Sequence, residues 1–460
     1  MELSQIKTKV SIYSKSNKIS IQKAWDVFFF ESFLYRLSKS EYSQNFAIKG
    51  GFYLQSIVGI QMRSTMDIDL KYIGNRLNEN DLKSIFKDIC NQNYDNIRYI
   101  FLSVHDIAEK SKYGGKSIKI QAQFYNVKKI FSIDIGFDDI ITPYPISYNY
   151  HSPFCSETYN LFAYPVKTMI AEKFETLISK GVNNSRAKNF FDMYLLNKMK
   201  IDNDLLNASI INTFHARGTT YDQKYIENIL NDIFTFDRIK DLYNNYCLKH
   251  EFTKGISLND CFSAIINIFH KLTFLEKLNL KNYNVELHLV RHGEDEQNKT
   301  GGWSNNHLTE KGVQDVNELC KVIDSSYDFF ISSSLKRAEE TSLILNKMLN
   351  MDIIFNDDFR EMNNGLLANL TKEAFKEKYS NLYFSSLDMN EHYPNGESPN
   401  EFYYRIKSAF FNLIQNNQNK KILLVTHGGV ITIILSIVNG FPYSNKLKLS
   451  PQTASITVLR

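Results

Sequence analysis

The sequence predicts an α+β domain with a helical extension, followed by an α/β domain of three layers. Residues 46–140 hold short strand-like runs and turns. Residues 160–280 favour helices, with apolar positions three and four apart such as Val166, Met169 and Ile170. From Val285 onward, strand-like and helix-like segments alternate to the end, as a parallel sheet covered by helices requires.

Composition and charge narrow the class of protein. The chain has 460 residues, 43% hydrophobic and 23% charged, which suits two or three globular domains. A net charge of +4 excludes a histone-like protein and permits a local nucleic-acid groove. The five cysteines form no CxxC pair, the N-terminus is too polar for a signal peptide, and the apolar run Val430–Val438 is too short to span a membrane. We therefore expect a cytoplasmic protein without a membrane partner.

The clearest domain boundary is the change of pattern near Leu278–Tyr283. We expect a first domain over residues 1–280, with a core at about 20–160 and a helical part at about 161–280, and a second domain over 284–460. Residues 20–42 predict an amphipathic helix. A second helix is bounded by Pro165 at its start and Gly181 after its end.

Two aspartates mark the first candidate site. In a strand that contains Ile68 and Leu70, alternation turns these apolar side chains to the core and puts Asp67 and Asp69 on the opposite face. Two carboxylates in this arrangement form half of a site for a hard cation such as Mg²⁺.

A third carboxylate, Asp134, is expected from the neighbouring strand 131–137, which follows a strand-like run at 117–125. Three acidic groups around metal ions suit nucleotidyl transfer, and Gly50-Gly51 would let backbone N–H groups approach a triphosphate. Taken singly, a glycine pair is most often a turn, and an Asp-x-Asp is commonly a solvated strand face.

These residues together resemble the AbiEii-type toxin branch of the DNA polymerase β-like nucleotidyltransferases, over about residues 20–200. The likeness covers the KGG of Lys49–Gly51, the RSTMDID of Arg63–Asp69, Asp134, and the segments Lys167–Lys173 and Arg186–Asp192. It implies that Gly50, Gly51, Arg63, Thr65 and Lys167 bind the NTP and that Asp192 belongs to the active site. Without the likeness, Lys167 and Asp192 are helix-surface charges. Asn189 departs from the family, which usually has Asp there.

The resemblance also implies an activity and a setting. Family members transfer a nucleotide from an NTP, with Mg²⁺ at carboxylates such as Asp67, Asp69 and Asp134, and studied members act on RNA such as tRNA acceptor ends. They often belong to toxin–antitoxin or phage-defence systems. The residues alone indicate an NTP and an acceptor. Aromatic and basic segments such as 243–252 could line an RNA groove, although surface and core roles explain them more simply.

The second candidate site lies at predicted strand ends. The strand 285–290 runs directly into Arg291 and His292, and the strand 421–425 leads to His427. Such ends are where α/β sheets place ligands. Between them, Ser332–Ser334 predict helix N-caps that put Arg337 in a first helical turn.

This set of residues suits phosphoryl transfer to an imidazole. A neutral His292 would attack phosphorus, while Arg291, Arg337 and a protonated His427 hold the phosphate oxygens. A carboxylic acid must protonate the leaving oxygen. Glu361 is the candidate, with Glu294 and Glu397 as alternatives in plausible loops.

Residues 284–460 resemble the histidine phosphatase superfamily. The matching pieces are LVRHGE (289–294), Asn298, LTEKG (308–312), SSSLKRAEET (332–341), REMNNG (360–365), PNGES (394–398) and VTHGGVI (425–431). The likeness implies a mainly parallel sheet flanked by helices, no metal, a His292 nucleophile, a supporting contact from Asn298 and Glu361 as acid. The segment after Gly365 lacks the usual Trp-Glu-Gly pattern, and the domain is shorter than the glycolytic mutases, which favours a phosphatase.

The two halves together predict a bifunctional enzyme that uses an NTP and an unidentified phosphorylated substrate. One alternative is a scaffold or sensor with one idle domain. Another is a nucleotidyltransferase that modifies a small molecule. The sequence leaves open the NTP base, the acceptor and the oligomeric state, and it permits a homo-oligomer.

Overall fold

The computed structural model describes residues 3–60, 67–74, 76–107, 114–154, 157–380 and 382–460. The chain divides into two compact units, Met1–Lys271 and Leu272–Arg460. Residues 272–280, which the sequence pattern placed in the first domain, group with the second unit. The reason is that the N–H groups of Leu275 and Leu278 donate to the carbonyls of Gly440 (3.1 Å) and Val438 (3.2 Å).

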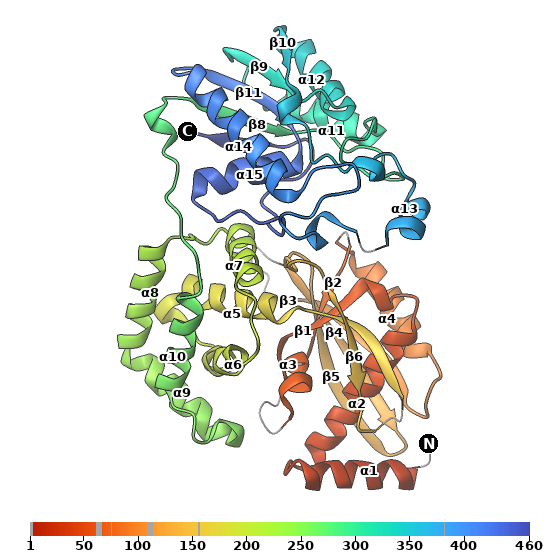
Figure 1. The fold of residues 1–460 in the computed structure, drawn as a ribbon. Helices are drawn as coiled ribbons and strands as arrows, with labels where there is room; N and C mark the ends of the chain where they lie inside the picture. The colour runs from red at the N-terminus through yellow and green to blue at the C-terminus, as the bar shows by residue number, and fades with distance from the viewer. Residues whose placement is uncertain (1–2, 61–66, 75, 108–113, 155–156, 381) are drawn as a thin grey trace. The chain divides into compact units, whose positions relative to one another are not determined.

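A seven-stranded mixed sheet organises the first unit, in the order β3-β4-β5-β2-β1-β7-β6 (Figure 1). Its strands are β1 (Phe46–Lys49), β2 (Ile68–Tyr72), β3 (Arg98–Ile107), β4 (Gly115–Phe124), β5 (Val127–Gly136), β6 (Ile146–His151) and β7 (Thr158–Ala163). β1 is antiparallel to β2 and parallel to β7, and β2 is parallel to β5. The end of β1, the start of β2 and the end of β7 therefore lie at the same end of the sheet.

Ten helices of this unit lie in the described residues. They are α1 (Leu3–Ser16), α2 (Ile21–Lys39), α3 (Gly50–Val58), α4 (Glu79–Asn91), α5 (Val166–Lys180), α6 (Ala187–Asn197), α7 (Asn203–Arg217), α8 (Gln223–Thr235), α9 (Asp237–Lys249) and α10 (Leu258–Phe269). Helices α5–α10 gather beside the sheet as the predicted helical extension (Figure 1). α5 ends before Gly181, as the sequence predicted, and begins at Val166, so that Pro165 is its N-cap and not its first residue.

Helix α2 confirms the helix predicted at 20–42, but the prediction that it is amphipathic is wrong. Its Phe-Phe-Phe run is buried, and so are the polar Asp26, Glu31 and Arg36. The helix packs against α1, α4 and β7 together, so several of its faces are covered. Aromatic rings fill the contact with the sheet, for example Phe30 and Phe131 with centroids 5.0 Å apart.

Arg36 shows how a charge is accommodated inside this core. Its side chain is 1% exposed, and its guanidinium donates to the carbonyls of Cys90 (3.2 Å), Gln92 and Ile97 (2.6 Å) and pairs with Asp95. Cys90 lies in the last turn of α4, and the other acceptors belong to the segment that joins α4 to β3. One buried side chain from α2 thus accounts for three backbone carbonyls at the end of α4 and in the connection that follows it.

The second unit is a three-layer α/β fold, as predicted, with sheet order β10-β9-β11-β8-β12. Its elements are β8 (Glu286–Arg291), α11 (Glu310–Cys320), β9 (Phe329–Ser332), α12 (Lys336–Leu349), β10 (Ile353–Phe355), α13 (Lys372–Tyr379), α14 (Pro399–Asn416), β11 (Lys421–Thr426), α15 (Gly428–Asn439) and β12 (Ile456–Leu459). Four strands are parallel and β12 is antiparallel to β8. Val290, Leu423 and Val425 turn to one face, where they pack with residues of α11 and α12.

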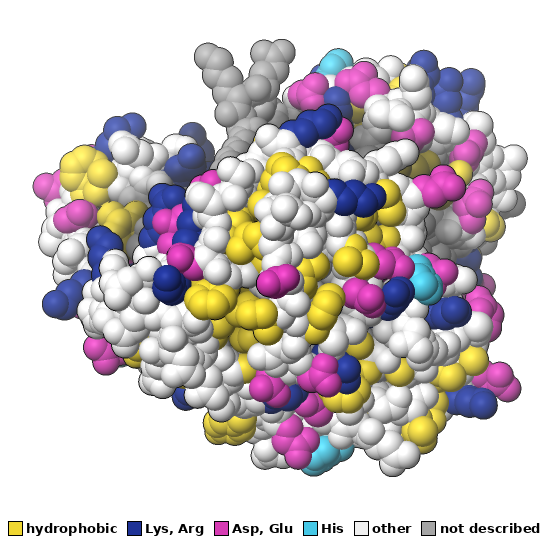
Figure 2. All heavy atoms as spheres, turned by 90° about the horizontal axis from the view of Figure 1, so that it is seen from above, with side chains coloured by type: hydrophobic (Ala, Val, Ile, Leu, Met, Phe, Trp, Pro, Cys, Tyr) yellow, Lys and Arg dark blue, Asp and Glu magenta, His cyan; other side chains and the backbone are white. Residues whose placement is uncertain are grey.

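The surface matches the small net charge. On the face in Figure 2, basic and acidic side chains are interspersed with hydrophobic ones, and the described atoms form no continuous basic stripe there. Among the helices that the structure describes, none combines the length and apolar character needed to cross a membrane. Cys90, Cys247, Cys261 and Cys320 are free thiols.

We expect Arg36→Ala to lower the free energy of unfolding of the first unit by about 3–5 kcal/mol, because Asp95 and three carbonyls would lose a buried donor. Urea unfolding of the full chain, followed by a probe in the first unit, measures this. Arg98→Ala removes an exposed arginine from nearby β3 and serves as the matched control. Equal stability of the two variants would contradict the role given to Arg36.

Candidate active sites

In the first unit, two carboxylates lie side by side on adjacent strands. Asp69 on β2 is in register with Asp134 on the parallel strand β5 and with Lys49 on β1. Ser117 donates to Asp134 Oδ1 at 2.7 Å. Burial raises the pKa of Asp69 and the charge of Asp134 adds to this rise, whereas Lys49 and Lys188 oppose it. The pair is therefore a place where added positive charge is favourable.

The glycine pair lies directly against one carboxylate of this pair, that of Asp69. Gly50 and Gly51 open helix α3, and the Gly51 N–H donates to Asp69 Oδ2 at 3.4 Å. Gly50 has a φ of +68°, and a Cβ atom there would lie 1.9 Å from Asp69 Oδ2. The position thus requires glycine both for its backbone conformation and for the close approach of the carboxylate.

The three-carboxylate metal site predicted from Asp67, Asp69 and Asp134 is formed in part. Within the described ranges, no three His, Cys, Asp or Glu side chains are arranged to hold a metal ion. Asp67 is exposed and lies one residue before β2, so strand pairing does not fix it beside the other two. The two paired oxygen donors, with the raised pKa of Asp69, still suit a hard cation.

A network of charged side chains, most of them partly buried, lies behind this end of the sheet. Lys49 pairs with Asp139 and with Glu172 of α5 (3.4 Å), and Arg217 at the end of α7 pairs with Asp139 (3.0 Å) and with Glu175 (2.6 Å). The neighbouring carboxylates hold the pKa of Lys49 well above its usual value despite burial. The network ties the sheet to the helical extension next to the carboxylate pair.

In the second unit, His292 follows β8 and is oriented by the backbone of the next residue. Its Nδ1 lies 2.7 Å from the Gly293 carbonyl oxygen, an acceptor, so Nδ1 carries the proton and Nε2 keeps a lone pair. Burial, together with the charges of Arg337 and Arg291, holds the pKa of His292 well below its usual value. The ring is thus a neutral imidazole with an available nitrogen.

Arg337, in the first turn of α12, reaches Nε2 of the His292 ring. Its side chain is 2% exposed, and its Nε donates to His292 Nε2 at 3.3 Å. The two terminal nitrogens donate to the Gly302 carbonyl (2.9 Å) and to the Ser304 hydroxyl (3.3 Å). Asp295 lies 3.7 Å from Nε. Positive charge is therefore held against the lone pair that would attack phosphorus.

His427 follows β11 and lies beside His292, with ring centroids 5.1 Å apart. Its Nε2 is 2.7 Å from the Ser333 hydroxyl, and its buried Nδ1 has no hydrogen-bond partner among the described residues. Arg291 enters from the end of β8, donates to the Pro451 carbonyl at 2.8 Å, and leaves a buried Nε without an acceptor in the described part. A guanidinium N–H and a ring nitrogen that both lack partners in the described part suit the binding of an oxyanion.

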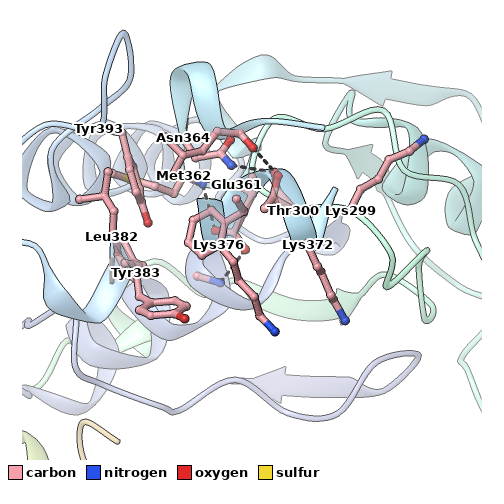
Figure 3. Close-up of a pocket in the computed structure, with 16 residues that line it drawn as sticks. Lys299, Thr300, Glu361, Met362, Asn364, Lys372, Lys376, Leu382, Tyr383 and Tyr393 are labelled. Carbon is pink, nitrogen blue, oxygen red and sulfur yellow. Dashed lines mark hydrogen bonds between the residues drawn. The ribbon is translucent and has the colours of Figure 1, made fainter. Parts of the chain in front are cut away.

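A cavity of about 530 Å³ adjoins this cluster, and Glu361 lines it (Figure 3). The Glu361 carboxylate accepts the N–H groups of Met362 and of Gly429 at the start of α15, each at 3.0 Å. Gly302, whose carbonyl holds Arg337, and Gly429, two residues after His427, also line the cavity. The cavity therefore leads to the histidine pair.

Comparison with known proteins agrees with both geometries. Residues 32–255 match the family described as nucleotidyl transferase AbiEii toxin, type IV toxin–antitoxin system, and residues 287–460 match the histidine phosphatase superfamily, branch 1. The uncharacterized phosphatase PhoE of Bacillus subtilis is 31% identical over 33% of this chain and 76% of its own. The chain joins an AbiEii nucleotidyltransferase domain to a histidine phosphatase domain. Both are enzyme domains.

Further similar proteins match the phosphatase domain. The probable phosphoglycerate mutase GpmB of Escherichia coli O1:K1 is 28% identical over 38% of this chain and 83% of its own. The solved alpha-ribazole phosphatase of Shigella flexneri is 22% identical, covers 38% of this chain and 89% of its own, and has a TM-score of 0.34.

The structure of the phosphatase domain brings His292, Arg337 and His427 together, with Arg291 and Glu361 at the same strand edge. It differs from the sequence analysis at two points. Burial and the charge of Arg337 hold the pKa of His427 well below its usual value, so this histidine is neutral rather than protonated. Leu335, not a serine, caps α12. Asn298 is exposed, and its backbone carbonyl accepts the Lys372 N–H (3.3 Å).

In the nucleotidyltransferase domain, Arg63 and Thr65 lie outside the described residues. Lys167 is in the first turn of α5, which follows β7. It therefore lies at the same end of the sheet as Gly50, which follows β1. Asp192 is not a surface charge, because it is fully buried on α6 and pairs with Lys173 of α5 at 2.7 Å. This ion pair joins two helices of the extension.

Sequence reasoning missed three residues. Ser333 was interpreted as a helix cap, yet it holds His427. Ser304 holds Arg337, and no local motif marks it. Lys188 acts on Asp69 through its charge, and it lies in the segment Arg186–Asp192 that resembles the nucleotidyltransferase family.

We expect Gly50→Ala to abolish nucleotidyl transfer and to destabilise the nucleotidyltransferase domain by more than the ~1 kcal/mol of a positive-φ glycine. Its Cβ atom would displace Asp69. Gly59→Ala is the matched control, since Gly59 also has positive φ (+91°) but nothing within 4 Å of a Cβ. Activity and urea unfolding of both variants measure the difference. Equal effects would show that the approach to Asp69 is unimportant.

We expect the phosphatase domain to lose stability as the pH falls below about 6.5, by about 1.4 kcal/mol per pH unit for each of His292 and His427. Their folded pKa values are depressed, so the unfolded chain takes up protons that the folded chain does not. Urea unfolding between pH 7.5 and 5.5 measures the slope. His427→Gln should reduce it, and exposed His307→Ala should not. An unchanged slope in His427→Gln would contradict a buried neutral His427.

Proposed function

We propose that the chain is a bifunctional enzyme. The first domain transfers a nucleotide from an NTP to an RNA acceptor such as tRNA, and the second hydrolyses a phosphomonoester through a phosphohistidine. The observation that carries the second activity is the lone pair of His292 Nε2, which the contact of Nδ1 with the Gly293 carbonyl leaves unprotonated and which Arg337 Nε faces at 3.3 Å. The paired carboxylates of Asp69 and Asp134 under Gly50-Gly51 support the first.

In the phosphatase reaction, His292 Nε2 forms a bond to phosphorus as the bond to the leaving oxygen breaks. Arg337, Arg291 and His427 bind the phosphoryl oxygens, His427 as a neutral donor in the protein as it stands. The protonated carboxyl of Glu361 gives its proton to the leaving oxygen. The resulting carboxylate then takes a proton from the water that attacks phosphohistidine, which releases phosphate and restores His292.

In the transferase reaction, the carboxylates of Asp69, Asp134 and Asp67 would hold Mg²⁺, which neutralises charge on the triphosphate when bound. The backbone N–H groups at the start of α3 bind phosphate oxygens, and Lys167 at the same sheet edge adds positive charge. Lys188 and Lys49 offset the carboxylate charge beside them. The chain thus surrounds the site of transfer with cations and amides.

The RNA acceptor and a toxin–antitoxin or phage-defence setting follow from the AbiEii family. In such a setting, the phosphatase would restrain or assist the transferase. A scaffold with one idle domain is the alternative that the incomplete carboxylate trio of the described residues favours. Activity of point variants separates the two.

The purified full chain should transfer label from one α-labelled NTP to RNA when Mg²⁺ is present, and Asp69→Asn should abolish this. His292→Ala should lower hydrolysis of p-nitrophenyl phosphate by at least about 10³-fold, because the nucleophile is lost. Asp241→Asn and His307→Ala change exposed residues of the same types and should leave both activities intact.

Each arm has a result that contradicts it. Label in RNA that persists in Asp69→Asn would exclude the assigned transferase site. Label that enters a small molecule and not RNA would show that the acceptor is a small molecule and would contradict the proposed RNA acceptor. Phosphatase activity that survives in His292→Ala would exclude the phosphohistidine.

A further inference from the structure

The cavity beside Glu361 has an unusual combination of walls. Aromatic residues line one part, where Phe375 and Tyr383 lie with ring centroids 5.5 Å apart and Tyr393 is almost fully buried. Lysines line another part, and Figure 3 shows Tyr383 and Tyr393 on one side of Glu361 with Lys299 and Lys372 on the other. Among the described residues that line the cavity, Glu361 is the sole acid.

The position of the cavity indicates which part of a substrate it receives. His292, Arg337 and His427 bind the phosphate and do not line it, whereas Glu361, the acid for the leaving oxygen, does. The group that departs from phosphorus must therefore occupy this cavity. Its volume of about 530 Å³ is within the ~300–1,000 Å³ typical of small-molecule sites.

The lysines indicate that this leaving group is itself anionic. Lys372 and Lys376 are four residues apart on α13 and so share a face, with Phe375 between them. Lys299 comes from a separate loop. Across the described parts of the chain, no ion pair involves any of the three, so their charges are not neutralised by protein carboxylates. Three cations in the wall of a cavity that has a single acid favour a second phosphate.

We propose that the phosphatase domain acts on a nucleotide unit that carries a further phosphate, so that the base stacks on the aromatic wall and the second phosphate binds the lysines. This inference rests on the proposed phosphatase activity and names its substrate class. A free nucleoside bisphosphate and the phosphorylated end of an RNA share this chemistry. Hydrolysis of a terminal 3′-phosphate would leave a 3′-hydroxyl, which is the group that a nucleotidyltransferase extends.

The test compares kcat/KM for adenosine 3′-monophosphate, adenosine 3′,5′-bisphosphate, a short oligoribonucleotide with a 3′-phosphate, and fructose 1,6-bisphosphate. We expect the second phosphate to raise kcat/KM about tenfold over the monophosphate, and the base to favour the nucleotides over the sugar. The oligoribonucleotide and the free bisphosphate separate the two sources. Equal kcat/KM for mono- and bisphosphate, or preference for the sugar, would overturn the inference.

The double variant Lys372→Ala/Lys376→Ala should bring the bisphosphate-to-monophosphate ratio close to one. The double variant Lys347→Ala/Lys378→Ala removes the same charge from exposed positions of this domain outside the cavity lining and should keep the ratio. An equal fall of the ratio in both variants would reduce the effect to general charge and overturn the inference.

A binding measurement keeps this inference distinct from the proposed activity. His292→Ala cannot form phosphohistidine, so calorimetric titration with the two adenosine phosphates reports recognition alone. Tighter binding of the bisphosphate by about tenfold supports the cavity assignment even if no substrate turns over. Hydrolysis of p-nitrophenyl phosphate without any preference in rate or binding would preserve the phosphatase and overturn the substrate class.

Discussion

The phosphatase site depends on one buried guanidinium, that of Arg337. An arginine keeps its proton in any protein environment, so its burial places a permanent positive charge beside His292 and His427. Burial, together with that charge, holds the pKa of both imidazoles well below the usual value and so favours their neutral forms. The Gly302 carbonyl and the Ser304 hydroxyl hold the guanidinium in place, while Asp295 at 3.7 Å balances it weakly. The excess charge makes the pocket complementary to a phosphate dianion, and the same charge preserves the lone pair that attacks it.

The nucleotidyltransferase site has the opposite charge at its centre, because its central groups are carboxylates. Asp69 and Asp134 lie in register. Behind them, the two cations Lys49 and Arg217 pair with the three carboxylates of Asp139, Glu172 and Glu175. Removal of one partner from such a buried pair costs about 3–5 kcal/mol. The network therefore fixes helices α5 and α7 to the end of the sheet where Gly50 and Lys167 lie. This frame holds the carboxylate pair, whose charge Lys49 and Lys188 offset, at the place where a cation would bind.

Local pattern was sufficient for the elements and motifs that these sites use. Strand alternation predicted that Asp69 and Asp134 would share a sheet face, and the strand-end rule placed His292 and His427 together. Contacts distant in sequence were not accessible in this way. The pattern of 20–42 could not show that α1, α4 and β7 cover several sides of α2, and nothing local pairs Asp192 with Lys173. Strand alternation could not place Asp67, because this residue lies just before the paired strand β2 begins.

Packing distinguishes the three carboxyl groups that sequence left as candidates for the acid. Glu294 accepts from Lys311 at 2.9 Å, which lowers its pKa and favours the ionised form, a poor proton donor. Glu397 is held by two nitrogens of Arg405, at 2.7 and 2.9 Å. Glu361 meets backbone N–H groups and lines the cavity, and a Cβ atom on Gly429 would lie 2.2 Å from its Oε1. The second glycine after His427 therefore makes room for the acid, so one turn at the start of α15 serves both the phosphate and its leaving group.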